Sequence, residues 1–87
     1  MSAPLRVLYF AWVRERVGLG EEQVAPPAGV RTVGDLMGWL AGRGEGHAHA
    51  FENPGIIRSA LDRAHAGHST PLGDAREIAF FPPVTGG

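Results

Sequence analysis

The sequence contains no cysteine, and because all eight of its basic residues are arginine it contains no lysine either. Without cysteine the chain can form no disulfide, no thiolate metal site and no thioester on a sulfur of its own. Without lysine it lacks the P-loop residue that contacts nucleotide phosphates, so it cannot activate a substrate with ATP by that route. We therefore expect activation chemistry to come from a partner protein.

An excess of charge of one sign is also missing, since the formal net charge is −1 and the arginines are scattered along the chain. This gives no electrostatic reason to expect nucleic acid or a membrane surface as a partner. No apolar run approaches the length of a membrane span, and the run near the amino terminus is too short for a signal peptide core. We expect a cytoplasmic protein.

The length of 87 residues, of which 44% are hydrophobic, fits one small domain. A body of this size buries only about 60 to 65% of its unfolded surface, which allows one core and little room for a deep active site. We expect a domain over residues 1–81, followed by an extended, flexible tail over residues 82–87.

A single helix is clearly indicated after residue 31. Thr32, with Asp35 three positions later, approximates a capping box. The apolar residues that follow repeat at the spacing of one helical face, which predicts a helix lying across a sheet. These residues are Val33, Leu36, Met37 and Leu40.

The remaining segments predict strands and turns. Residues 11–17 read as a turn of helix or a loop, the Gly- and His-rich residues 43–54 as a loop, and residues 70–75 as a turn. Residues 59–64 suit a helix as well as a strand on propensity alone. Strands are predicted at residues 5–10, 22–25, 56–61, 64–67 and 77–81. This order fits an α+β fold of the β-grasp type, a mixed sheet with one main helix packed on its face.

Alternation along the last predicted strand directs Ile78 and Phe80 to one face of the sheet and Phe81 to the other. Phe81 is then either exposed as a docking surface or covered by a loop, and the sequence favours neither reading. The strand cannot continue beyond it, because Pro82 and Pro83 have no backbone N–H and fix φ near the polyproline value. The chain must leave the sheet there.

The residues after the prolines form a thin strip. Val84 and Thr85 favour extended backbone, and Gly86 and Gly87 have no Cβ. From the end of the last strand this tail spans at most about 20 Å, enough to enter a narrow site on another protein. Its terminal carboxylate, with a pKa of about 3.5, is ionised and inert at neutral pH until a partner converts an oxygen into a leaving group. The alternative is a functionless terminus.

Histidines and tryptophans offer weaker signals. His47 and His49 on the predicted loop are interpreted as solvated, since two histidines on irregular chain lack preformed ligand geometry, and we expect no metal. His65 likewise has no companion acid and nucleophile. Trp12 and Trp39 are expected to pack in or beside the core.

Residues 7–15, 70–72 and 77–87 together resemble the MoaD family of ubiquitin-like sulfur carriers, the small subunits of molybdopterin synthase. The closing run Phe-Phe-Pro-Pro-Val-Thr-Gly-Gly is the most specific part of this resemblance, because a terminal Gly-Gly alone is common among ubiquitin-like proteins. The chain departs from the family at Asp62 and Arg63, where an Asn-Gln type turn is usual. It also has Ala75 where a glycine is usual, which argues against a positive φ there.

The resemblance implies a mechanism in which the carboxylate of Gly87 carries sulfur. A separate activating enzyme, similar to the ubiquitin-activating type, would adenylate it with ATP, and a sulfur donor protein would convert it to a thiocarboxylate. The tail would then enter the large subunit of a heterotetramer and donate sulfur to cyclic pyranopterin monophosphate. The chain would bind no permanent cofactor and would act only as the small subunit of this sulfurtransferase. The implied partner-binding residues are Phe81, Pro82, Pro83, Val84, Thr85 and Gly86.

Two alternatives share the terminal glycines. One is a sulfur carrier for thiamine, cysteine or tRNA thiolation, although the Phe-Phe-Pro-Pro-Val stretch favours the molybdopterin branch. The other is a ubiquitin-like modifier that is conjugated to lysines of other proteins.

Overall fold

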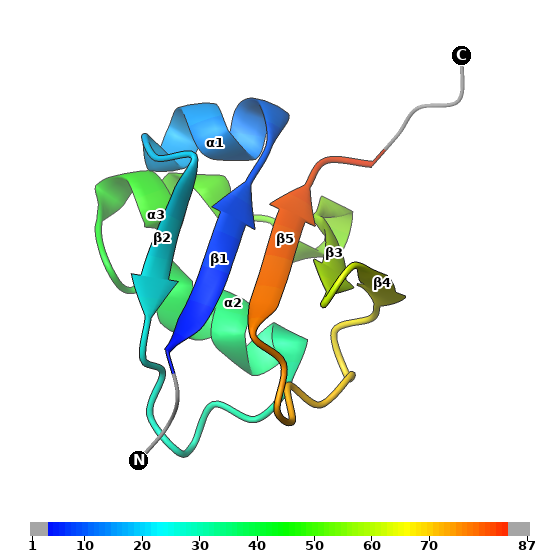
Figure 1. Ribbon diagram of the computed structural model, residues 1–87. Helices are drawn as coiled ribbons and strands as arrows, with labels where there is room; N and C mark the ends of the chain where they lie inside the picture. The colour runs from blue at the N-terminus through cyan, green and yellow to red at the C-terminus, as the bar shows by residue number, and fades with distance from the viewer. Residues whose placement is uncertain (1–3, 84–87) are drawn as a thin grey trace.

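Within residues 4–83, which this computed structural model describes, five strands form one mixed sheet (Figure 1). The predictions for residues 84–87 lie outside the described residues, so the division at residue 82 stays a prediction. The strands are β1 (Leu5–Tyr9), β2 (Glu21–Val24), β3 (Arg58–Leu61), β4 (Ala64–Ala66) and β5 (Glu77–Phe81). Their order across the sheet is β2-β1-β5-β3-β4.

The centre of the sheet is the parallel pair β1 and β5, and every other pairing is antiparallel. Because Tyr9 lies beside Phe80 in this pair, the two strands finish at the same end of the sheet. Alternate side chains of both strands are buried against the helices, among them Val7 and Ile78. This mixed sheet with a helix across one face confirms the predicted β-grasp.

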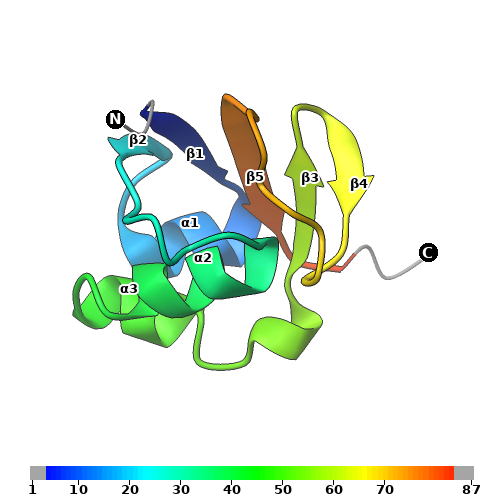
Figure 2. The ribbon, with the colours of Figure 1, turned by 90° about the horizontal axis from the view of Figure 1, so that it is seen from below.

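The helices all lie on one side of the sheet (Figure 2). They are α1 (Ala11–Val17), α2 (Val33–Ala41), α3 (Glu45–Ala50) and the short 3₁₀ helix η1 (Pro54–Ile56). Residues 11–17, predicted as a turn of helix or a loop, therefore form a helix. None of the helices in residues 4–83 has both the length and the apolar character that a membrane span requires.

The helix α2 begins at the predicted capping box. Thr32 Oγ1 accepts a hydrogen bond of 3.1 Å from the backbone N–H of Asp35, and Asp35 Oδ2 accepts one of 3.2 Å from the backbone N–H of Thr32. Bonds from the backbone N–H groups of Arg31 and Thr32 hold the pKa of Asp35 below its ordinary value. The predicted apolar stripe of α2 is buried, and each such side chain contributes about 1.5 to 3 kcal/mol to stability.

The loop prediction for residues 43–54 is wrong, because this segment contains α3 and the start of η1. Gly46 explains why a helix fits there. A Cβ at Gly46 would lie 2.6 Å from the carbonyl oxygen of Arg16 and 2.9 Å from that of Val17, so only glycine lets α3 approach α1 this closely. The helix is short and packs on α1 and α2, so distant contacts stabilise it.

The structure of residues 54–66 corrects the predicted start of the third strand and decides between helix and strand for residues 59–64. Residue 56 belongs to η1, so β3 begins at Arg58 rather than at residue 56. Residues 59–64 are strand and turn, and not helix. Asp62 and Arg63 form the predicted turn between β3 and β4, both with positive φ. In the next turn the positive φ falls on Gly73, and Ala75 has none, as predicted.

Trp12 and Trp39 are partly buried against the core, which confirms their predicted packing. An arginine guanidinium covers each ring, with Arg16 at 4.4 Å from the centroid of Trp12 and Arg43 at 4.9 Å from that of Trp39. The two stacked rings belong to helices, Trp12 to α1 and Trp39 to α2.

Candidate functional site

The end of β5 places Phe81 at the point where the chain leaves the sheet. The strand is paired on both sides, and Arg58 of β3 lies directly opposite Phe81. On the other side the backbone N–H of Phe10 donates a 3.1 Å bond to the carbonyl of Phe80. The backbone beneath Phe81 is therefore fixed by two neighbouring strands.

Phe81 is neither fully exposed nor covered by a loop. Its side chain is half-buried, and its ring meets the ring of His65 in β4 edge to face, with centroids 6.0 Å apart. The alternation prediction is confirmed, since Ile78 and Phe80 are buried on the opposite face. Phe81 thus keeps an accessible apolar surface beside the last described residues.

Pro82 and Pro83 follow the strand and belong to no secondary structure element, as predicted. Pro82 is half-buried and Pro83 is exposed. The other predicted site residues, Val84, Thr85, Gly86 and Gly87, lie outside the described residues. Of the predicted site residues, the structure therefore describes only residues 81–83. The functional roles of residues 81–87 stay predictions.

A further aromatic residue, not predicted from the sequence, is exposed at this end of the sheet. Phe10 directly follows β1 and is 49% exposed, and β1 finishes beside β5. The next residue, Ala11, has a positive φ of 53°, a conformation that costs energy for a residue with a Cβ. The signal was present in the alternation of β1, which buries Tyr9 and so turns Phe10 the other way.

A polar cluster joins α3 to the edge of the sheet. Glu22 Oε2 accepts a hydrogen bond of 2.8 Å from the hydroxyl of Tyr9 and lies 2.6 Å from His47 Nε2. The other carboxylate oxygen, Oε1, lies 3.9 Å from Arg43 Nη2. The prediction that His47 is solvated on a loop is therefore wrong. Within residues 4–83 no group of three or more His, Asp or Glu side chains is arranged to hold a metal.

Burial and hydrogen bonding oppose each other in this cluster. Burial alone would raise the pKa of Glu22, but the hydrogen bonds from His47 and Tyr9 and the charge of Arg43 outweigh it and hold the pKa below its ordinary value. Burial and the bond to Glu22 raise the pKa of Tyr9, which stays a neutral donor. Among the described residues no buried side-chain polar atom lacks a hydrogen-bond partner, so this cluster is satisfied and serves to hold α3 against β1 and β2.

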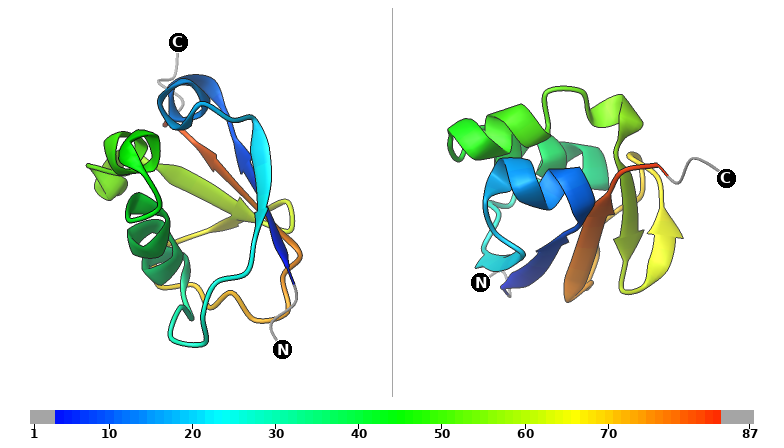
Figure 3. Two further views of the ribbon diagram at one scale, coloured as in Figure 1. Left: turned by 90° about the vertical axis from the view of Figure 1, so that its left-hand side faces the viewer. Right: turned by 90° about the horizontal axis from the view of Figure 1, so that it is seen from above.

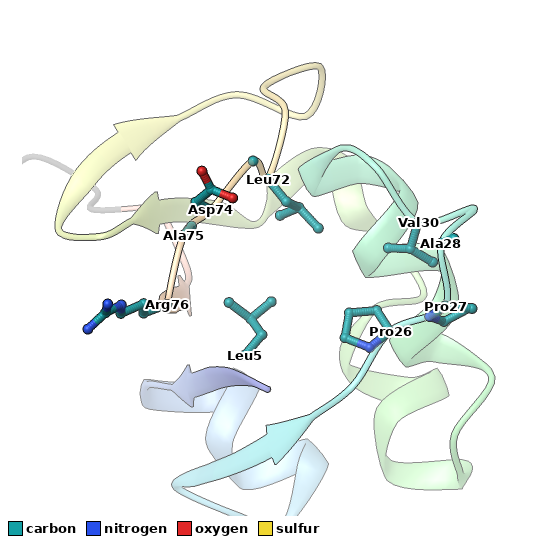
Figure 4. A pocket seen from close by; sticks show the side chains of 10 residues that line it. Leu5, Pro26, Pro27, Ala28, Val30, Leu72, Asp74, Ala75 and Arg76 are labelled. Carbon is teal, nitrogen blue, oxygen red and sulfur yellow. The ribbon is translucent and has the colours of Figure 1, made fainter. Parts of the chain in front are cut away.

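A pocket of about 490 Å³ lies at the opposite end of the sheet, where β1 and β5 begin (Figure 4). Its wall is mostly apolar, and the side chains of Asp74 and Arg76 lie at its border. The sequence did not predict it. The residues that line it are Leu5, Pro26, Pro27, Ala28, Val30, Leu72, Gly73, Asp74, Ala75 and Arg76. No pair of these groups forms an acid and nucleophile arrangement, so the tail end remains the candidate site.

Comparison with known proteins decides the family. The sequence profile of the ThiS family matches residues 7–87, which includes the candidate site and the tail. The chain belongs to the ThiS family. A relative, the molybdopterin synthase sulfur carrier subunit of Escherichia coli strain K12, is 41% identical over 95% of this chain and 99% of its own length.

Solved structures agree with this membership in the ThiS family. A Pyrococcus furiosus protein assigned as molybdopterin converting factor subunit 1 superposes with a TM-score of 0.76 at 27% identity, covering 95% of this chain and all 100% of that one. Small archaeal modifier protein 1 from Haloferax volcanii superposes with a TM-score of 0.73, also at 27% identity and with the same coverage. The β-grasp is thus shared by a protein named as a molybdopterin converting factor subunit and by one named as a modifier.

Proposed function

We propose that this chain is the sulfur carrier subunit of a molybdopterin synthase and that the carboxylate of Gly87 carries the sulfur. The observation that carries the proposal is the 41% identity to a molybdopterin synthase sulfur carrier subunit over 95% of the chain and 99% of that relative. The match to the ThiS family covers residues 7–87, which include Phe81 and the tail.

The chemistry requires other proteins. An activating enzyme similar to the ubiquitin-activating type transfers the adenylyl group of ATP to the Gly87 carboxylate and releases pyrophosphate. Hydrosulfide supplied by a sulfur donor protein then attacks the carbonyl carbon, the bond to AMP breaks, AMP departs, and a thiocarboxylate remains. The absence of cysteine and lysine from the chain supports this division of labour, since the chain lacks the usual groups for activating itself.

The partner in the synthase is a large subunit, and the complex is a heterotetramer. Phe81 packs on that subunit, while Pro82 and Pro83 direct the chain into its active site and Gly86 lets the strip fit. There the sulfur passes to cyclic pyranopterin monophosphate, and the Gly87 carboxylate is restored by water. The half-buried ring of Phe81, held by paired strands on both sides, supports this role because a fixed apolar anchor loses little entropy on binding.

Reconstitution tests the proposal. The thiocarboxylated chain, mixed with the large subunit and the pterin precursor, is expected to yield molybdopterin, which is measured as its fluorescent oxidation product. Deleting Gly87 or adding residues after it should abolish the product and leave the circular dichroism spectrum unchanged. Full activity of the extended chain would refute the terminal carboxylate as the sulfur carrier.

A ubiquitin-like modifier is the second candidate, favoured by the superposition on small archaeal modifier protein 1 at a TM-score of 0.73. This function would leave Gly-Gly remnants from the chain on lysines of other proteins after proteolysis. Their detection by mass spectrometry, together with no molybdopterin in the reconstitution, would favour the modifier. Sulfur carriage for thiamine, cysteine or tRNA thiolation predicts neither remnants nor molybdopterin.

A further inference from the structure

The face of the sheet opposite the helices is uncovered, as the left view of Figure 3 and Figure 2 show. We call it the outer face. Strand alternation and register place its members, since residues directly opposite in paired strands point to the same side. They are Arg6, Leu8, Glu21, Gln23, Arg58, Ala60, His65, Glu77, Ala79 and Phe81.

The outer face has an apolar centre and charged ends. Leu8 and Ala79 are opposite each other in β1 and β5, and Ala60 lies opposite Ala79 in β3. All three are half-buried although no helix covers them. Phe81 extends this apolar strip to the end of the sheet where the chain leaves β5.

At the end far from the tail the guanidinium of Arg6 is paired with carboxylates of the same face. Arg6 Nε lies 2.9 Å from Glu21 Oε2, and Arg6 Nη1 lies 3.9 Å from Glu77 Oε1. This cation is paired on two sides. Arg6 therefore needs no carboxylate from a partner.

At the tail end the cation is not neutralised. Arg58 is exposed and lies opposite Phe81, and in residues 4–83 it forms no salt bridge. The neighbouring side chain on the same face is His65, whose ring packs against Phe81. The outer face therefore carries an unpaired guanidinium next to an apolar strip, although the whole chain has a net charge of −1.

We propose that Arg58 is a specificity-determining residue that binds a carboxylate of the large subunit at the border of the interface anchored by Phe81; this rests on the proposed function. A partner that covers Phe81 must also cover or border Arg58, because the two are opposite each other in adjacent strands. Desolvating that guanidinium without a counter-charge is costly, whereas a carboxylate forms two parallel hydrogen bonds with it. A partner surface that is basic at this border is repelled.

The occupant is a protein surface with an apolar centre and an acidic border. A nucleic acid does not fit, since a single arginine beside an apolar strip offers one phosphate contact and no basic stripe. This protein is the large subunit, because the partner that binds the tail also covers the neighbouring surface at Phe81 and Arg58. Recognition by the apolar patch alone would not discriminate against partners of similar hydrophobicity.

Isothermal titration calorimetry of the full chain against the large subunit tests the proposal. Arg58→Glu is expected to weaken binding by at least about tenfold and Arg58→Gln by about three- to tenfold, since the partner carboxylate loses its cation. The wild-type affinity should fall more steeply with added salt than that of Arg58→Gln. The matched control is Arg63→Glu, in the turn at the other end of β3, which should change the affinity by less than about twofold.

The outcomes separate this proposal from the proposed function. Wild-type affinity in Arg58→Glu, alongside weaker binding by Phe81→Ala, would overturn the role of Arg58 and leave the carrier function standing. An equal loss in Arg63→Glu would also overturn it, because a long-range charge effect would then explain the result. A wild-type chain that does not bind the large subunit refutes the carrier function itself. Unchanged thermal melts of the variants ensure that folding is not the cause.

Discussion

At the scale of single residues, Gly46 shows how the lack of a side chain determines the packing of two helices. Gly46→Ala would place a Cβ 2.6 Å from the Arg16 carbonyl oxygen, so α3 must shift away from α1. We expect a loss of about 1 to 3 kcal/mol in the free energy of unfolding, as for an overpacked core. Urea unfolding followed by circular dichroism measures it.

The matched control is the same substitution in α2. A Cβ at Gly38 would meet nothing within 4 Å. Gly38→Ala should therefore raise the free energy of unfolding by about 0.5 to 1 kcal/mol, because alanine is the better helix former. If both substitutions changed stability in the same direction, the close α1–α3 approach described above would be wrong.

Glu22 provides a prediction for the dependence of stability on pH. Its pKa is lowered in the folded state, so ionised Glu22 contributes stability above its ordinary pKa of 4.5, and this is lost as the pH falls through the folded value. We expect Glu22→Gln to destabilise the protein at pH 7 and to have a smaller effect at about pH 3. Free energies of unfolding of both proteins at the two pH values measure this.

The groups facing Glu22 are His47 on α3, Tyr9 on β1 and Arg43 between α2 and α3. His47→Gln keeps a hydrogen-bond donor and is the conservative variant with which to compare the loss. A difference between wild type and Glu22→Gln that is the same at both pH values would contradict the assigned cause of the lowered pKa.

At the scale of elements, some segments were predictable and others were not. The helix α2 was predictable because Thr32 and Asp35 form a local cap and the buried stripe repeats at helical spacing. The helix α3 was not, because its composition of glycine and histidine favours a loop. Its helical state depends on contacts distant in sequence, such as the packing of Gly46 on α1 and the bond from His47 to Glu22, 25 positions away.

The turn between β3 and β4 positions the start of β5. Asp62 Oδ1 accepts hydrogen bonds of 3.0 Å from the backbone N–H groups of both Arg76 and Glu77. We expect Asp62→Ala to lower the free energy of unfolding by about 1 to 3 kcal/mol, because two donors lose their acceptor and alanine is strained at the positive φ of this position. Urea unfolding measures the change.

Asp62→Asn is the control for this turn. Asparagine keeps one acceptor oxygen and tolerates the left-handed conformation. Asp62→Asn should therefore lower the free energy of unfolding by less than about 1 kcal/mol. Equal losses for the two variants would show that the hydrogen bonds to β5 contribute nothing.

At the scale of the whole molecule, the parallel pairing of β1 and β5 gathers the candidate site at one end. Phe81 and the two prolines were predictable, because alternation and proline chemistry are local. The places of Arg58 and His65 beside Phe81, and of Phe10 next to the end of β5, were not predictable. They depend on a register between strands far apart in sequence. The activating enzyme, the sulfur donor and the roles of residues 81–87 stay predictions.

The central claim is that sulfur is carried on the carboxylate of Gly87, and the intact mass of the chain tests it most directly. The chain is incubated with its activating enzyme, a sulfur donor and ATP, and then analysed by mass spectrometry with fragmentation. We predict a species heavier by one exchange of oxygen for sulfur, with the added mass on the fragment that contains Gly87 and no such species in a chain lacking that residue. A mass that never changes, or an exchange located elsewhere in the chain, would contradict the account.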